Sequence, residues 1–139
     1  MLDAVLNFLS NGLSGAGWVA MLVYVLVMTQ LTIFTVTLYL HRSQTHGAVT
    51  FHPAVAHFMR AWLWLRTAMP TKEWVAVHRC HHANVDSDGD PHSPIVFGIW
   101  RVVLLGTQLY HTAAHNRAIC DQYGKGTPPT GWSAGSTSR

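Results

Sequence analysis

The chain has 139 residues, about the length of one domain. Hydrophobic residues make up 49% of it and charged residues only 11%, a balance that excludes a disordered chain and disfavours an ordinary soluble surface. The net charge is +3 and no basic run occurs, so nucleic-acid binding is not expected. Two cysteines cannot form a disulfide scaffold, whereas ten histidines are an unusually large number for this length.

The first long feature is an uncharged apolar segment, residues 18–40. No Asp, Glu, Lys, Arg or His occurs between Asp3 and His41. As a helix, the segment would be about 34 Å long, enough to cross a hydrocarbon core of roughly 30 Å. Only a helix satisfies its own backbone in lipid, so the segment predicts a transmembrane helix. A buried core helix is the alternative. A signal peptide is disfavoured because no basic residue precedes the segment.

The charges on the two sides of this segment predict its orientation. Basic residues follow it, at Arg42, Arg60, Arg66, Lys72 and Arg79, whereas none precedes it. The positive-inside rule then puts everything after residue 40 on the cytoplasmic side. The predicted location is therefore a membrane, which would be the inner (cytoplasmic) membrane in a bacterium.

Three further helices are expected, over residues 53–69, 71–84 and 94–119, with a polar loop at 85–94. The first carries both Trp and Arg, which is typical of a helix in the headgroup region. Residues 124–139 are rich in Gly, Pro, Ser and Thr, and we expect them to be disordered.

These elements predict an all-α membrane protein, with one transmembrane helix followed by cytoplasmic interfacial helices that carry two histidine clusters. Residues 1–17 would be a short N-terminal segment on the far side and residues 18–40 the transmembrane helix. Residues 41–123 would be the cytoplasmic and interfacial histidine region, and residues 124–139 the disordered tail.

The second histidine cluster, HRCHH, contains His78, His81 and His82. At about 100° per residue, their side chains would project at roughly 0°, −60° and +40°, from one face of a helix. Neutral imidazole is a common metal ligand, so this cluster predicts a metal site. A chance grouping of surface histidines is the alternative.

The first cluster, HRSQTH, contains His41 and His46 and begins where the apolar segment ends. Five residues apart, they would lie about 140° from each other on an ideal helix and share no face. They could converge if the helix frays after Leu40, or if a metal lies between several helices. Asp90 and His92 follow the second cluster closely, and we expect them to orient the ligand imidazoles through hydrogen bonds.

HRSQTH directly after a membrane span, then HRCHH and an acidic loop ending in DPHSP, resemble the membrane fatty-acid desaturases of the acyl-CoA or delta-9-like group. The flanks LYLHR, TKEWVAVHRCHH and YGKGTPP agree, and the resemblance covers roughly residues 16–129. It implies a non-haem di-iron site with two Fe, O2 as co-substrate, and removal of two hydrogens from a fatty-acyl chain. The family's iron ligands carry over to His41, His46, His78, His81 and His82.

The same resemblance implies the partners. These are a fatty-acyl substrate (acyl-CoA or acyl-lipid), membrane lipid, and an electron donor such as a ferredoxin or a b-type cytochrome with its reductase. The family also has a third histidine box of the HxxHH type, which this sequence lacks. The chain is therefore expected to be truncated and inactive alone. Two other functions stay open: a non-catalytic membrane metal-binding protein, and a related di-iron hydroxylase acting on alkanes or carotenoids.

Overall fold

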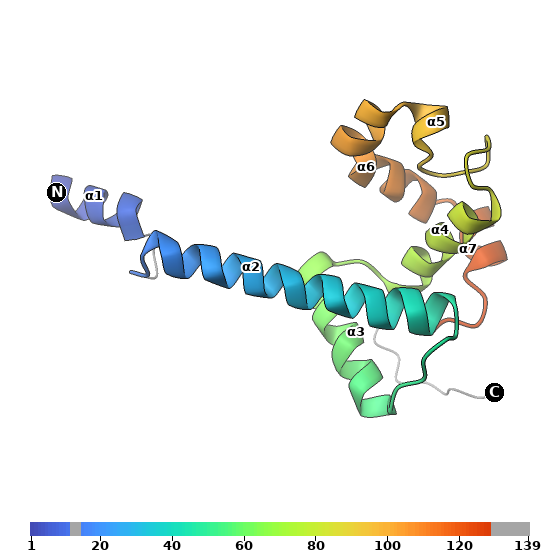
Figure 1. The fold of residues 1–139 in the computed structure, drawn as a ribbon, viewed down its shortest axis with the longest axis horizontal. Coiled ribbons are helices and arrows are strands. Elements are labelled where there is room, and N and C mark those ends of the chain that lie inside the picture. Colours follow the sequence, from blue (N-terminus) through green and yellow to red (C-terminus); the bar gives the residue numbers. More distant parts are fainter. Residues whose placement is uncertain (12–14, 129–139) are drawn as a thin grey trace.

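The computed structural model describes residues 1–11 and 15–128. Within these ranges the chain forms helices and no strand (Figure 1), which confirms the all-α prediction. The elements are α1 (Leu2–Asn11), α2 (Trp18–Thr35), the π-helix η1 (Val36–Thr45), α3 (Pro53–Thr67), α4 (Thr71–Ala83), α5 (Pro94–Phe97), α6 (Ile99–Ala114) and α7 (Arg117–Tyr123).

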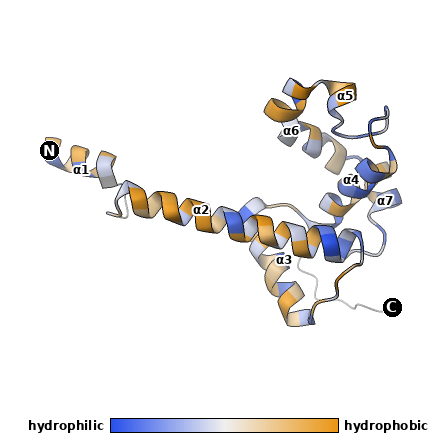
Figure 2. Ribbon diagram, in the orientation of Figure 1, coloured by the Kyte–Doolittle hydropathy of each residue, from blue (hydrophilic) through white to orange (hydrophobic). Residues whose placement is uncertain are grey.

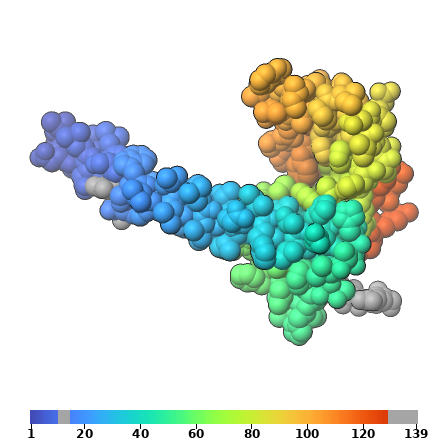
Figure 3. Space-filling model, viewed as in Figure 1, coloured from blue at the N-terminus to red at the C-terminus, as the bar shows by residue number. Residues whose placement is uncertain are grey.

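α2 and η1 form one continuous helix, Trp18–Thr45, of 28 residues. By length and composition it can cross a membrane, and it is the one described helix that can. It projects from the rest of the molecule as a rod (Figures 1 and 3), and apolar residues cover its first half (Figure 2). Large apolar side chains such as Leu22, Leu26 and Phe34 are exposed along it. An apolar surface of this length suits a lipid environment.

The end of this helix packs against α3 through a small apolar core. Tyr39, Leu40 and Leu63 are buried there, and Met59 and Trp74 pack against them. α3 begins where Nδ1 of its N-cap residue, His52, accepts a hydrogen bond from the backbone N–H of Ala54 (3.3 Å). α3 is steeply inclined to the long helix in Figure 1.

α4 is the central element, because it contacts η1, α6 and α7. Its second apolar contact is formed by Val77 with Ala113 and Ala114, and Tyr110 and Ile119 pack against this cluster. In the view of Figure 1, α3 lies on one side of the long helix's end, and α5 and α6 lie on the other. α4 therefore connects the end of the long helix to α6 and α7.

The single helix predicted over 94–119 is wrong, because the structure contains three helices there. Gly98 separates α5 from α6 with a φ of +83°, a conformation that glycine adopts without strain. The backbone of Leu105 departs from helical geometry inside α6, and α6 itself ends at Ala114. Apolar spacing continues across such breaks, so the helical period alone does not reveal them.

The start of the segment expected to be disordered, residues 124–128, is described. Gly124 follows α7 and is buried. Residues 129–139, the rest of that predicted tail, lie outside the described residues.

Candidate metal centre

The first histidine cluster lies in η1, where the helix widens. The backbone N–H of His46 donates to the carbonyl of His41 (3.1 Å), a bond from residue i+5 to residue i that defines a π-helix. The Thr45 hydroxyl makes a second bond of this span, to the carbonyl of Leu40 (2.8 Å). The wider turn brings the His41 and His46 rings together, with centroids 4.6 Å apart.

Of the two ways in which His41 and His46 could converge, fraying of the helix after Leu40 is not the one that the structure shows. The helix neither frays at Leu40 nor keeps the α-helical period that gives a separation of about 140°. It continues to Thr45 as a π-helix, and Gly47, with a φ of +63°, follows its end. π-helical turns are rare, and many of them lie at functional sites.

The second cluster lies on α4, where His78 and His82 are one turn apart. Their Nε2 atoms are 3.1 Å apart, so both rings present the same nitrogen to the same point. The Trp74 ring stacks on His78, with centroids 4.7 Å apart and an interplanar angle of 21°. This stacking restrains the orientation of the His78 imidazole.

The two clusters meet between η1 and α4. The ring centroids of His41 and His78 are 4.9 Å apart, and those of His46 and His82 are 5.1 Å apart. One nitrogen from each of these residues lies within 4.8 Å of the others. We call His41, His46, His78 and His82 the four-imidazole group. Two of its members, His46 and His82, are exposed, so small ions have access to it.

His81 belongs to a neighbouring cluster, the His81–Asp90–His92 group. Its Nδ1 lies 2.9 Å from both carboxylate oxygens of Asp90, and the His92 ring stacks on it at 4.5 Å. The His81 ring centroid is 5.7 Å from that of His82. Ligand atoms of this group also lie within 4.8 Å of one another. Asp90 and His92 therefore both contact His81, one of the predicted ligands.

Asp90 is fixed by the loop between α4 and α5. It is 1% exposed and accepts hydrogen bonds from the backbone N–H groups of Asp86 and His92, each 3.1 Å long. Burial alone would raise the pKa of Asp90, but the bonds from His81 and from these two N–H groups lower it. An ionised carboxylate only accepts, so Nδ1 of His81 donates to Asp90, and in the neutral tautomer with the proton on Nδ1 the lone pair of Nε2 is free.

His78 is also held in the form that binds metals. Burial, and then the nearby imidazoles of His82 and His41, lower its pKa to about 4. The ring is therefore neutral at pH 7 and has a lone pair to offer.

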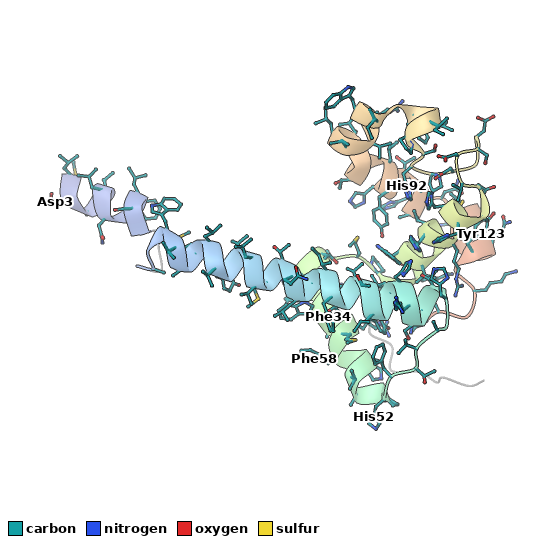
Figure 4. The ribbon with its side chains drawn as sticks, viewed as in Figure 1. Asp3, Phe34, His52, Phe58, His92 and Tyr123 are labelled. Atoms are coloured by element: carbon teal, nitrogen blue, oxygen red, sulfur yellow. The ribbon has the colours of Figure 1, made fainter. Side chains whose placement is uncertain are left out.

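The remaining histidines are outside both groups. His57, His111 and His115 are exposed. Cys80 is buried, and its Sγ lies 3.6 Å from the Gly89 carbonyl, so this thiol packs in the interior. Figure 4 shows His92 beside α4, far from His52 at the start of α3.

Two residues at this centre escaped sequence reasoning. Trp74 is four residues before His78, a helical spacing that does signal contact. Arg79 reaches main-chain carbonyls at the end of η1, and carbonyl partners leave no trace in a sequence.

Comparison with known proteins found relatives among curated desaturases. The chain is 33% identical over 75 residues to a delta-9 desaturase-like 2 protein of Arabidopsis thaliana, a match that covers 54% of the chain and 25% of the relative. It is 38% identical over 65 residues to an icosanoyl-CoA 5-desaturase of Limnanthes douglasii, covering 47% and 18%. It is 36% identical over 66 residues to a chloroplastic palmitoyl-monogalactosyldiacylglycerol delta-7 desaturase of Arabidopsis thaliana, covering 47% and 17%.

The chain spans about a quarter of the length of the first of these relatives and less than a fifth of the other two. No family model matches the chain. No solved structure matches it significantly either.

Proposed function

We propose that the chain, which is similar to curated fatty-acid desaturases over about half of its length, contributes the first two histidine boxes of a membrane-bound iron centre that desaturates a fatty-acyl chain. The observation that carries this proposal is the convergence of four imidazoles, two from η1 and two from α4, within 4.8 Å of one another. These residues are distant in sequence and come together through the packing of one helix on another.

The donor set of this centre fits iron. Imidazole nitrogen suits iron, copper, nickel and zinc as a ligand. Thiolate ligands would instead favour Cu(I), zinc or iron–sulfur clusters. The described cysteines are outside both histidine groups. The His78 and His82 Nε2 atoms, 3.1 Å apart, have a separation that suits a shared proton or a shared cation. Among the described members of the two groups, the one carboxylate is that of Asp90, which accepts a hydrogen bond from Nδ1 of His81.

We assign His41, His46, His78, His81 and His82 as iron ligands. Asp90 holds the His81 ring so that Nε2 stays free for metal, a role typical of carboxylates behind ligand histidines, and His92 supports the same ring by stacking. When bound, the two irons supply the oxidising chemistry that unactivated methylene groups require. Loss of two hydrogens from the acyl chain, together with two electrons and two protons from a donor, balances the reduction of one O2 to two waters.

The same proposal places the chain in a membrane. Apolar side chains surround α2, and Figure 4 shows Phe34 on α2 and Phe58 on α3 at the outside of the molecule, where both are exposed. α3 also exposes Trp64 and Leu65, which suits a helix in the headgroup region. Because basic residues follow the span, we place the histidines on the cytoplasmic side. An acyl-CoA or acyl-lipid would then approach from the adjoining leaflet, and a ferredoxin or a b-type cytochrome with its reductase would supply electrons from the cytoplasm.

The test measures iron in the full chain, purified in detergent from an iron-supplemented host. We expect iron to co-purify with the wild type and to be lost from the double variant His78→Ala/His82→Ala. The matched control is His111→Ala/His115→Ala, which removes two exposed histidines with the same helical spacing. A wild type without iron, or equal iron loss in both variants, contradicts the proposal.

A second measurement separates the open functions. A desaturase-deficient host expresses the chain as part of a complete desaturase. The acyl composition of its lipids is compared between the wild type and the His78→Ala/His82→Ala variant. Unsaturated acyl chains that depend on the pair support the proposal. Hydroxylated products would favour the hydroxylase, and metal binding with wild-type amounts of product in the double variant would favour a non-catalytic metal-binding role.

A further inference from the structure

Arg79, in the second histidine box, bridges three parts of the chain. Its Nη2 and Nε donate to the carbonyls of Gln44 (2.7 Å) and Thr45 (3.3 Å), the last two residues of η1. Its Nη1 donates to the carbonyls of Tyr123 (3.0 Å) and Lys125 (2.8 Å), after α7. Among the described residues no carboxylate lies within ion-pair distance of it. All four partners are therefore main-chain oxygens.

These bonds complete the C-terminal end of η1. A helix leaves its last carbonyls without partners inside the helix, and a cation near them is favourable. Three of these carbonyls accept from the chain that follows, in the pairs His46 to His41, Gly47 to Ser43 and Ala48 to Arg42. The other two, those of Gln44 and Thr45, accept from Arg79. The guanidinium thus takes the place of the next helical turn.

The same bonds fix the distance between the two histidine boxes. Arg79 directly follows His78, and Thr45 directly precedes His46, whose ring centroid is 6.3 Å from that of His78. Sliding or rotating η1 against α4 would stretch the Arg79 bonds as well as separate these imidazoles. Arg79 does not belong to either group of possible ligands.

The other side of the guanidinium holds the turn after α7. Gly124, between the two carbonyls that accept from Nη1, is buried against α4 and α7. A Cβ added there would lie 2.5 Å from the Cys120 carbonyl oxygen and 2.9 Å from Cγ of Lys72. The turn at Gly124 is therefore closely packed, with no room for a larger side chain. Arg79 connects this turn to the end of η1.

From this geometry we infer that Arg79 is a positioning residue, which sets the first histidine box against the second and links the Tyr123–Lys125 turn to the metal centre. The inference rests on the proposed function, because it concerns the same four-imidazole group. Arginine is required for this role. Its planar fork directs donors at two separate carbonyl pairs, whereas the three donors of a lysine share one nitrogen.

The experiment titrates the full chain in detergent with Co²⁺, whose ligand-field absorption reports both affinity and coordination geometry. For Arg79→Lys we expect affinity to fall about 10–100-fold, as for residues that orient metal ligands, and the absorption bands to change shape. Arg117→Lys, at an exposed position on α7, keeps wild-type affinity and bands. The helical circular dichroism signal of each variant reports folding.

A second variant, Gly124→Ala, displaces the Tyr123–Lys125 turn, whose carbonyls accept from Arg79, and leaves the arginine itself in place. We expect it to weaken Co²⁺ binding in the same direction, and this result decides the matter if Arg79→Lys does not fold. Wild-type affinity and bands in folded Arg79→Lys, or in Gly124→Ala where the lysine variant fails to fold, overturn the positioning role and leave the proposed function standing. Absence of Co²⁺ binding by the wild type overturns both.

Discussion

The four-imidazole group and the His81–Asp90–His92 group lie side by side but satisfy their ring nitrogens differently. In the first, the imidazoles face one another, and the closest nitrogen pair is His78 Nε2 and His82 Nε2. In the second, a buried carboxylate accepts from His81 at 2.9 Å and is itself held by two backbone N–H groups. The first group, as described, consists of imidazoles alone, and the second pairs its imidazole with a fixed carboxylate acceptor.

This difference separates two physical roles. Converging lone pairs are stabilised by a cation, so the four-imidazole group is a binding site for metal. A ring whose Nδ1 proton is fixed by a carboxylate has a defined tautomer and orientation, which raises its basicity as a ligand. The second group therefore prepares one ligand, whereas the first supplies the site.

The largest effect is expected from removing a ligand of the four-imidazole group. His46→Ala deletes one of the two imidazoles that the π-helix brings together. We expect its affinity for Co²⁺ or Fe²⁺ to fall by more than the roughly 10–100-fold that a change behind a ligand causes. Metal titration of the detergent-solubilised chain measures this. His57→Ala, at an exposed position on α3, is the control. Equal losses of affinity in both variants would contradict the assignment of His46 as a metal ligand.

A smaller effect is expected in the second group. Asp90→Asn keeps the shape of the side chain but removes the charge that fixes the His81 tautomer. We expect metal affinity to fall roughly 10–100-fold and the free energy of unfolding to fall by about 1–3 kcal/mol, because a buried acceptor is replaced by a partly unsatisfied amide. Isothermal titration and thermal unfolding measure these quantities.

Asp88→Asn is the matched control for this comparison, because Asp88 is an exposed carboxylate in the same loop. It should leave both affinity and stability unchanged. If Asp90→Asn binds metal as tightly as the wild type, the carboxylate does not prepare a ligand, and the two groups are independent.

The contrast also shows what the sequence reveals and what it hides. His78, His81 and His82 follow the ordinary helical period, which predicts a common face, and Asp90 and His92 are marked by their closeness to this cluster, whereas the division into two groups does not follow from the period. The convergence of His41 with His46 was hidden, because π-helical turns are set by hydrogen bonding and packing at the end of η1. Arg79 was hidden for a similar reason, since its partners are carbonyls brought together only by the fold.

The π-helical turn offers a third, smaller test. Thr45→Val removes the hydroxyl that donates to the Leu40 carbonyl. Because one hydrogen bond contributes about 0.5–1.5 kcal/mol, we expect metal affinity to fall by several-fold at most. Thr32→Val is the matched control, since the Thr32 hydroxyl makes the ordinary i−4 bond to Met28 (2.8 Å) in α2. A larger loss in the Thr32 variant would argue that the π-turn does not shape the site.

The smallest effect is expected at a buried polar atom outside both histidine groups. The Tyr110 hydroxyl is buried and has no hydrogen-bond partner among the described residues. Burial, and then the nearby Glu73 carboxylate, raise its pKa to about 12. Replacing Tyr110 by Phe removes an unsatisfied donor, so we expect the free energy of unfolding to rise by about 1 kcal/mol with no change in metal affinity. Tyr123→Phe is the control of opposite sign, because the Tyr123 hydroxyl accepts from Asn84 (3.3 Å).

The effect of Tyr110→Phe should also depend on pH. A phenol whose pKa is about 12 in the folded chain and 10.0 in the unfolded chain favours folding below pH 10, and this contribution is lost as the pH rises towards 12. The wild type therefore loses stability over this range through Tyr110, and the Phe variant does not, so the gap between their melting temperatures widens from pH 9 to pH 11. A constant gap would mean that the hydroxyl ionises as readily in the folded chain as in the unfolded one.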